Sequence, residues 1–179
     1  MLSIDESHVQ LVESAWAGDL DSFGQLCEHY YSALVAVAYT VLGDHQLAED
    51  AAQEAFARGL VSLRKLKTPG KFAPWLAQIC RNVAIDMARA RRREVNVGAP
   101  SWAGDNSRDD SAVRVVRQAI GDLPASMKEL VVLRYYDNCS YEQISAVLGL
   151  SKTTINGRLT RAKRKLAKYL KRNGFPENR

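Results

Sequence analysis

The chain has 179 residues, of which 46% are hydrophobic and 25% are charged, and its formal net charge is +5. This composition is typical of a globular protein with one domain or two small ones, and it contains no apolar run of the roughly 18 residues that a membrane span needs. The first ten residues, MLSIDESHVQ, lack the basic and apolar segments of a secretory signal peptide, so we expect a cytoplasmic protein.

The sequence predicts no metal site, no cofactor and no catalytic centre. Its three cysteines, Cys27, Cys80 and Cys139, are far apart and form no CxxC pair, which is typical of reduced structural thiols. The three histidines share no ligand spacing with them. No nucleotide-binding loop or catalytic-triad pattern is present, so the chain is not expected to be an enzyme.

The charge is distributed unevenly along the chain. Residues 1–60 hold ten acidic residues and one basic residue, whereas residues 61–100 hold nine basic and two acidic residues. Residues 141–179 hold ten basic and two acidic residues. Two separate basic regions suggest two contacts with one nucleic acid. The acidic first third suggests a protein partner, although a solvated surface would have the same composition.

Apolar residues that recur at intervals of three and four predict three helices, at about residues 5–18, 21–42 and 45–63. The third contains LAEDAAQEAFARGL, in which the alanines allow a neighbouring helix to approach closely. A second, polar side of this helix carries Asp50, Gln53 and Glu54.

A basic loop at residues 64–71 precedes a fourth predicted helix, at about 73–93. Phe72 and Trp75 lie beside basic residues, a pattern that fits a surface for single-stranded DNA, where bases stack on rings and phosphates meet cations. The alternative is that Trp75 belongs to the core and that the arginines are solvated.

Residues 95–111 lose the apolar periodicity and are rich in Gly, Pro, Ser, Asn and Asp, as linkers between domains are. Trp102 is the one large apolar residue of this linker, and it either docks on a surface or has no role. Two further helices are expected after residue 112, one ending near Gly121 and one beginning at Pro124.

Residues 140–172 predict a helix-turn-helix. Ser140 and Gln143 form a capping-box pattern, Gly149 suits the turn, and Ser151 can cap the second helix. The second helix has one apolar side, and its other faces carry nine basic residues and no acid. Such a helix favours an anionic partner, and in a helix-turn-helix it enters the major groove of DNA. The alternative is a solvated pair of amphipathic helices in an ordinary bundle.

The order of these elements resembles a bacterial sigma factor of the extracytoplasmic-function (ECF) type, within the sigma-70 family. The helix with LAEDAAQEAFARGL resembles the polymerase-binding helix of sigma region 2, and FAPWLAQICRNVAIDMARARRRE resembles the helix of that region that reads and melts the minus-ten element. The stretch LPASMKELVVLRYYDNCSYEQISAVLGLSKTTINGRLTRAKRKL resembles region 4, which reads the minus-thirty-five element.

The resemblance implies an all-α fold with two small domains, region 2 at residues 1–94 and region 4 at 112–179, joined by a flexible linker at 95–111. It implies that the chain binds core RNA polymerase, at the clamp helices of the largest subunit and the flap of the second-largest, and directs it to promoter DNA. It also implies restraint by an anti-sigma factor.

The resemblance assigns three sets of residues. The set for core polymerase is Asp50, Gln53 and Glu54. The set for the minus-ten element is Lys71, Phe72, Trp75, Asn82, Arg89, Arg91 and Arg92, of which Asn82 matches a position that helps to hold a flipped base. The set for the minus-thirty-five element is Lys152, Thr153, Thr154, Asn156, Arg158 and Arg161.

The sequence also departs from the family pattern. Asn156 and Gly157 stand where the family commonly has a basic residue and a serine. Glycine in a helix interior costs about 1 kcal/mol relative to alanine, so Gly157 either permits close approach to DNA or is a neutral change. Asp19 and Asp21 match no role in the family.

Two other functions compete with a sigma factor. The first is a stand-alone helix-turn-helix regulator that binds duplex DNA as a dimer, through a dimerisation surface and without polymerase. The second is an adaptor whose basic tail contacts an acidic protein partner and binds DNA weakly, without regard to sequence. Neither needs the polar side at Asp50, Gln53 and Glu54, which therefore favours the sigma factor.

Overall fold

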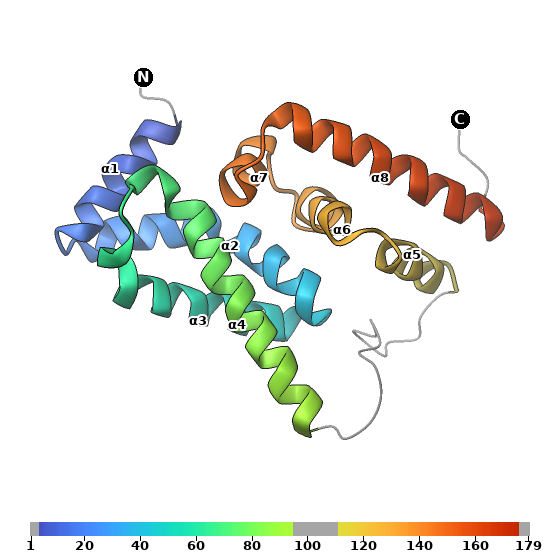
Figure 1. The fold of residues 1–179 in the computed structure, drawn as a ribbon, viewed down its shortest axis with the longest axis horizontal. Coiled ribbons are helices and arrows are strands. Elements are labelled where there is room, and N and C mark those ends of the chain that lie inside the picture. The colour runs from blue at the N-terminus through green and yellow to red at the C-terminus, as the bar shows by residue number, and fades with distance from the viewer. Residues whose placement is uncertain (1–3, 95–110, 176–179) are drawn as a thin grey trace.

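The computed structural model describes residues 4–94 and 111–175, and every regular element in these ranges is helical (Figure 1). The predicted all-α fold with two helical domains is confirmed. Nearly all of the predicted linker, with Trp102, lies outside the described residues. The elements are α1 (Ile4–Trp16), α2 (Leu20–Leu42), α3 (His45–Ser62), η1 (Leu63–Lys65), η2 (Pro69–Lys71), α4 (Phe72–Glu94), α5 (Ser111–Gly121), α6 (Ala125–Val131), η3 (Val132–Tyr136), α7 (Tyr141–Leu148) and α8 (Lys152–Arg172).

Side-chain caps set the ends of the N-terminal helices. The Asp19 carboxylate accepts the Asp21 backbone N–H at 3.1 Å and the Ser22 hydroxyl at 2.6 Å, which begins α2. Gly43 ends α2 in the left-handed conformation, with φ of 68°. Asp44 then begins α3 by accepting the Leu47 N–H at 3.1 Å. Asp19, which had no role by resemblance, is therefore a helix cap.

Small residues on α3 allow α2, α3 and α4 to pack closely. Four alanines on the inner side of α3 are fully buried, Ala48, Ala51, Ala52 and Ala55. A Cβ atom built at Gly59 would lie only 2.7 Å from Cδ1 of Leu76 on α4. Gly59 therefore allows the close contact between α3 and α4.

The C-terminal helices form the predicted helix-turn-helix, with α5 and α6 packed against α8. The Ser140 Oγ accepts the Gln143 N–H at 3.1 Å, and the Gln143 Oε1 accepts the Ser140 N–H at 2.8 Å, which completes the capping box. Gly149 makes the turn with φ of 65°, and Ser151 caps α8. Ile144, Ile155 and Leu159 are buried beneath the motif.

The two helical units pack side by side, with α4 and α2 against α6, η3 and α7 (Figure 1). An ion pair joins Arg81 of α4 to Glu129 of α6 at 2.5 Å. The rings of Tyr39 and Tyr136 stack, with centroids 4.9 Å apart and planes 9° apart. The units are thus held together by polar and aromatic contacts besides the apolar core.

Asp137 lies at this contact and is half-buried. Burial raises the pKa of its carboxyl to about 6, while the charge of His45 acts in the opposite direction. Its Oδ2 is buried and has no hydrogen-bond partner among the described residues. The folded chain therefore holds this proton more tightly than the unfolded chain, so stability falls as pH rises from about 4 to about 6.

We expect Asp137→Asn to raise the free energy of unfolding by about 1 kcal/mol at pH 7.5 and to change it little at pH 4.5, where the wild-type carboxyl is already largely protonated. Urea unfolding of both proteins at the two pH values measures the difference. Asp122→Asn, at an exposed position, is the control and should show no such difference. Equal effects of Asp137→Asn at both pH values would contradict the assignment.

Candidate nucleic-acid and protein interfaces

The polar side of α3 is exposed to solvent. Asp50, Gln53 and Glu54 are all exposed, as predicted from the sequence. Arg58, one turn beyond Glu54, donates from Nε to Glu54 Oε1 at 2.7 Å, and both side chains are about half exposed. An ion pair this exposed is weak and can be exchanged for a partner's cation.

An apolar patch continues the same side of α3. Val61 is 88% exposed and lies seven residues after Glu54, two helical turns along the same face. Leu60 beside it is 39% exposed. Val61 was not among the residues predicted from the sequence, although its spacing from Asp50 and Glu54 would have placed it on this side. The α3 face, defined as Asp50, Gln53, Glu54, Leu60 and Val61, is therefore acidic at one end and apolar at the other.

The residues predicted to contact the minus-ten element do not all lie on the same side of α4. At 100° per residue, Lys71, Trp75, Asn82 and Arg89 lie along one side of α4 and the turn before it. Arg91 lies on the opposite side, with its Nη1 4.0 Å from Asp44 Oδ2. The structure thus brings four of the seven predicted residues onto one line and separates Arg91 from them.

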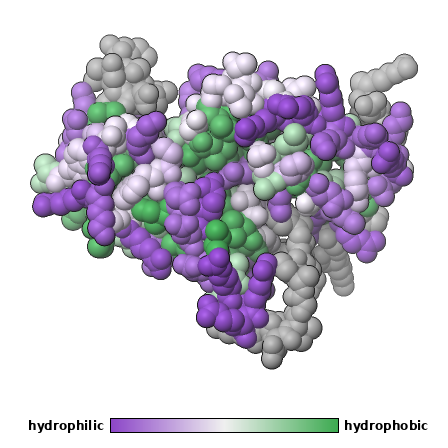
Figure 2. All heavy atoms as spheres, in the orientation of Figure 1, coloured by the Kyte–Doolittle hydropathy of each residue, from purple (hydrophilic) through white to green (hydrophobic). Residues whose placement is uncertain are grey.

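Gln78 and Arg93 lie on that line as well, although the sequence analysis did not include them. Gln78 donates from Nε2 to Asn82 Oδ1 at 2.9 Å, which orients the Asn82 amide. Arg93 donates to the Arg89 carbonyl at 3.4 Å. Hydrophilic side chains gather at this end of α4 and along α8 (Figure 2). We call the row of Lys71, Trp75, Gln78, Asn82, Arg89 and Arg93 the α4 row, in which Trp75 is half-buried and the others are exposed.

Phe72 does not belong to this row. Its side chain is 3% exposed and packs against Phe23, Tyr30 and Trp75, with ring centroids between 5.9 and 6.3 Å apart. In this conformation the Phe72 ring cannot stack on a base. It supports Trp75, which is only partly buried.

The N-terminal part of α8 presents most of the third predicted set to solvent. Lys152, Thr153, Asn156 and Arg161 are exposed, and Arg158 is half-buried. Thr154 is partly buried and belongs to the cap, since its N–H donates to Ser151 Oγ at 3.2 Å. Thr160 is exposed on the same side of α8 and was missed by the sequence analysis.

Lys152 forms an ion pair with Glu142 of α7 at 2.5 Å, and both side chains are about half exposed. The pair lies at the mouth of a groove of about 1020 Å³ between the two helical units. Lys71 and Pro74 line the groove from the first unit, and Gly149 and Lys152 line it from the second. The beginning of the α4 row and the beginning of α8 therefore face one groove in this arrangement.

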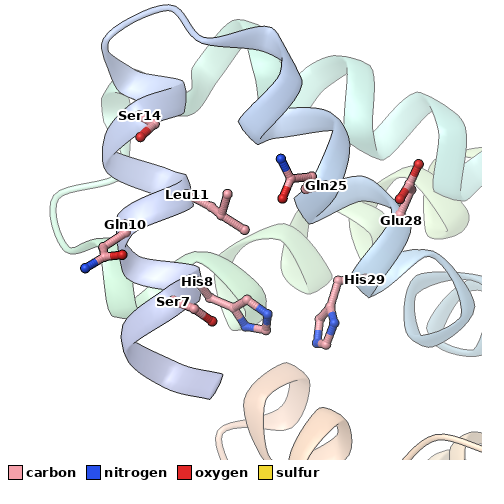
Figure 3. A pocket seen from close by; sticks show the side chains of 8 residues that line it. All are labelled: Ser7, His8, Gln10, Leu11, Ser14, Gln25, Glu28 and His29. Atoms are coloured by element: carbon pink, nitrogen blue, oxygen red, sulfur yellow. The ribbon is translucent and has the colours of Figure 1, made fainter. Parts of the chain in front are cut away.

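A second groove, of about 740 Å³, lies between α1 and α2 (Figure 3). His8 and His29 meet across it with ring centroids 4.1 Å apart, and a hydrogen bond of 3.0 Å joins His8 Nδ1 to the Tyr30 hydroxyl. Burial lowers the pKa of His29. Across residues 4–94 and 111–175, no three His, Cys, Asp or Glu side chains are grouped as metal ligands.

The cysteines are reduced in this structure, and two of them are fully buried. Burial raises the pKa of Cys80 to about 12, and its Sγ lies 3.4 Å from the Leu34 carbonyl oxygen. Burial likewise raises the pKa of Cys27 to about 11. Protonated thiols are poor nucleophiles and poor metal ligands, so Cys27 and Cys80 have a packing role.

Two family models match the chain, each on one helical unit. The model described as Sigma-70 region 2 matches residues 26–94, and the model described as Sigma-70, region 4 matches residues 114–166. No described helix has the length and apolar character needed to cross a membrane.

Curated proteins are similar along most of the chain. The probable RNA polymerase sigma factor RfaY of Xanthomonas campestris is 31% identical over 87% of this chain, which spans only 42% of that protein's length. The ECF RNA polymerase sigma factor EcfG of Rhodopseudomonas palustris is 30% identical over 77% of this chain and 79% of its own length.

Two solved structures have a similar fold. CnrH in complex with the cytosolic domain of CnrY has a TM-score of 0.61 at 26% identity, covering 94% of this chain and 99% of CnrH. RpoE of Bartonella quintana, in complex with the anti-sigma factor NepR, has a TM-score of 0.54 at 28% identity, covering 83% of this chain and 96% of RpoE.

Proposed function

Because the chain belongs to the ECF RNA polymerase sigma factors of the sigma-70 family, we propose that it binds core polymerase through the α3 face and reads promoter DNA with the α4 row and α8. Proteins of this family are initiation factors and not enzymes, so the polymerase carries out the chemistry. The observation that carries the proposal is the presence, on one chain and in family order, of three surfaces, one suited to core polymerase and two suited to promoter DNA.

The chemistry of the α3 face fits a basic protein surface. Carboxylates and an amide side by side accept hydrogen bonds from arginine, and such charge-assisted bonds are stronger than neutral ones. Val61 and Leu60 add apolar area that a protein partner can bury. We assign this face to the clamp helices of the largest polymerase subunit, and a second contact, from residues 112–179, to the flap of the second-largest.

The α4 row combines an aromatic ring, two amides and cations along one line. These are the groups that hold a single strand, because bases stack on rings while phosphates meet cations. In our proposal, Asn82 holds a base flipped out of the minus-ten element while Arg89 and Arg93 contact the backbone. Capture of that base offsets an unstacking cost of roughly a few kcal/mol, so recognition and melting occur together.

On α8, Thr153, Asn156 and Arg161 are assigned to the minus-thirty-five element in the major groove. We expect Asn156→Ala to weaken binding of holoenzyme to its promoter by about 1–3 kcal/mol and to relax the preference at one base pair, because asparagine pairs with adenine through two hydrogen bonds. Competition binding with promoters that carry each base at that position measures this. Gln118→Ala removes an exposed amide from α5 and should leave promoter binding unchanged. If Asn156→Ala weakened binding equally for every base at that position, Asn156 would not read a base.

We also propose that an anti-sigma factor restrains the chain in the cytoplasm. The similarity to CnrH and to RpoE, both solved with a bound protein, supports this. The α3 face and the groove between the two units are the surfaces that such a partner would have to cover in order to block polymerase and DNA.

The proposed function is tested by mixing the purified chain with core polymerase and following co-elution on gel filtration, with and without a fluorescent promoter duplex. A stable complex that binds the duplex more tightly than either component supports a sigma factor. Specific duplex binding by the chain alone, without a polymerase complex, would instead support the stand-alone regulator.

A further inference from the structure

Gly157 lies at the centre of the outward side of α8. The inward side is set by Ile155, Leu159 and Ala162, all at most 2% exposed. At 100° per residue, position 157 lies almost opposite these three. This is the side of the helix that a helix-turn-helix turns toward the major groove.

Nothing in the described part of the chain requires a glycine there. Glycine destabilises a helix interior relative to alanine, so a glycine at this position is expected to have a function. The glycines with positive φ are elsewhere, such as Gly43 and Gly149. A Cβ atom at position 157 would meet only the Nη2 of Arg161, at an ordinary 4.0 Å, unlike the 2.7 Å contact at Gly59.

Without a side chain, position 157 presents its Cα on the surface of the helix, beside the Arg161 guanidinium. Arg161 folds back along α8 and donates from Nε to the Gly157 carbonyl at 3.1 Å. Thr153 and Thr160, four residues before and three residues after, are the exposed neighbours on the same side. The glycine Cα is apolar, and the Arg161 Nη2, 4.0 Å away, is the nearest atom to the place that a side-chain Cβ would take.

We propose, resting on the proposed function, that Gly157 is a specificity-determining position that receives the methyl group of a thymine in the minus-thirty-five element. The thymine methyl is the one apolar group that the base pairs project into the major groove. A side chain at position 157 would occupy the same space, so the bare backbone lets α8 approach this base pair more closely.

The test adds a methyl group to the protein with Gly157→Ala and removes one from the DNA by replacing thymine with uracil. The wild-type chain with core polymerase first selects duplexes from a library randomised at the upstream element, and uracil then replaces each preferred thymine in turn. With the thymine-containing duplex, we expect Gly157→Ala to weaken binding about tenfold. When uracil replaces the thymine that contacts position 157, Gly157→Ala should bind the duplex within about twofold of the wild-type chain. Uracil has no methyl group, so the alanine methyl then has nothing to clash with.

Two readouts separate this result from a change in folding. Gly157→Ala should raise the melting temperature by about 2–4 °C, and Gly24→Ala, at an exposed helical glycine with nothing within 4 Å, should raise it similarly and leave DNA binding unchanged. The role of Gly157 would be overturned if wild type and Gly157→Ala bound the thymine duplex equally, or if the variant's weaker binding persisted on every uracil duplex. Neither result would affect the proposed function. Failure of the wild-type chain to select any duplex with polymerase would overturn the proposed function as well.

Discussion

Replacing Glu54 with lysine is expected to weaken binding of this sigma factor to core RNA polymerase about 100-fold. Glu54 lies in the middle of the α3 face, and its only ion-pair partner in the described structure is Arg58, on the same helix. Lysine at position 54 would repel Arg58 and any arginine of the polymerase that the carboxylate accepts. Loss of one member of a buried, hydrogen-bonded charge pair at an interface typically costs 2–5 kcal/mol or more.

Titration of a fluorescently labelled chain with core polymerase measures this affinity. Glu13→Lys makes the same change of charge at an exposed position on α1, so it controls for net charge and should bind within about twofold of wild type. The folding of Glu54→Lys should be nearly unchanged, because an exposed ion pair contributes at most about 1 kcal/mol. Equal affinities of the two variants would remove the α3 face from the polymerase interface.

Replacing Gly59 with valine is expected to lower the free energy of unfolding by about 3 kcal/mol. A Cβ atom at this position already lies 2.7 Å from Cδ1 of Leu76, and the Leu76 side chain is fully buried and cannot move into solvent. The two γ-methyl groups of valine add to this overlap, and overpacking of a filled core usually costs 1–3 kcal/mol and sometimes more.

Gly24→Val is the matched control for this prediction. Gly24 is also a helical glycine, but nothing lies within 4 Å of a Cβ atom built there. Valine and glycine differ little in helix propensity, so the control should change stability by less than about 0.5 kcal/mol. Urea unfolding measures both variants, and similar stabilities for the two would show that α3 and α4 do not pack as closely as described.

Local sequence patterns predicted the helix-turn-helix in detail. The capping box of Ser140 and Gln143, the turn at Gly149 and the cap at Ser151 depend only on neighbours within four residues, and all of them formed as predicted. The helices of the N-terminal unit were also predicted to within a few residues at each end, because apolar periodicity and glycine breaks mark them clearly.

Features that depend on distant residues were not predicted. The Arg81–Glu129 ion pair joins residues 48 positions apart, so no local pattern indicates it. The cluster of arginines in residues 89–93 predicted cations near DNA, but helix phase decides which of them share a side with Asn82. Burial of Phe72 likewise follows from the aromatic cluster around it and not from its own neighbours in the sequence.

Run-off transcription tests the central claim most directly. Purified core polymerase is supplied with a library of promoter fragments, with the wild-type chain, with the Glu54→Lys chain or with neither. We predict a small set of new transcripts that require the wild-type chain, are lost with Glu54→Lys, and share two conserved elements upstream of their starts. Transcripts that are identical with and without the chain would contradict its role as an initiation factor.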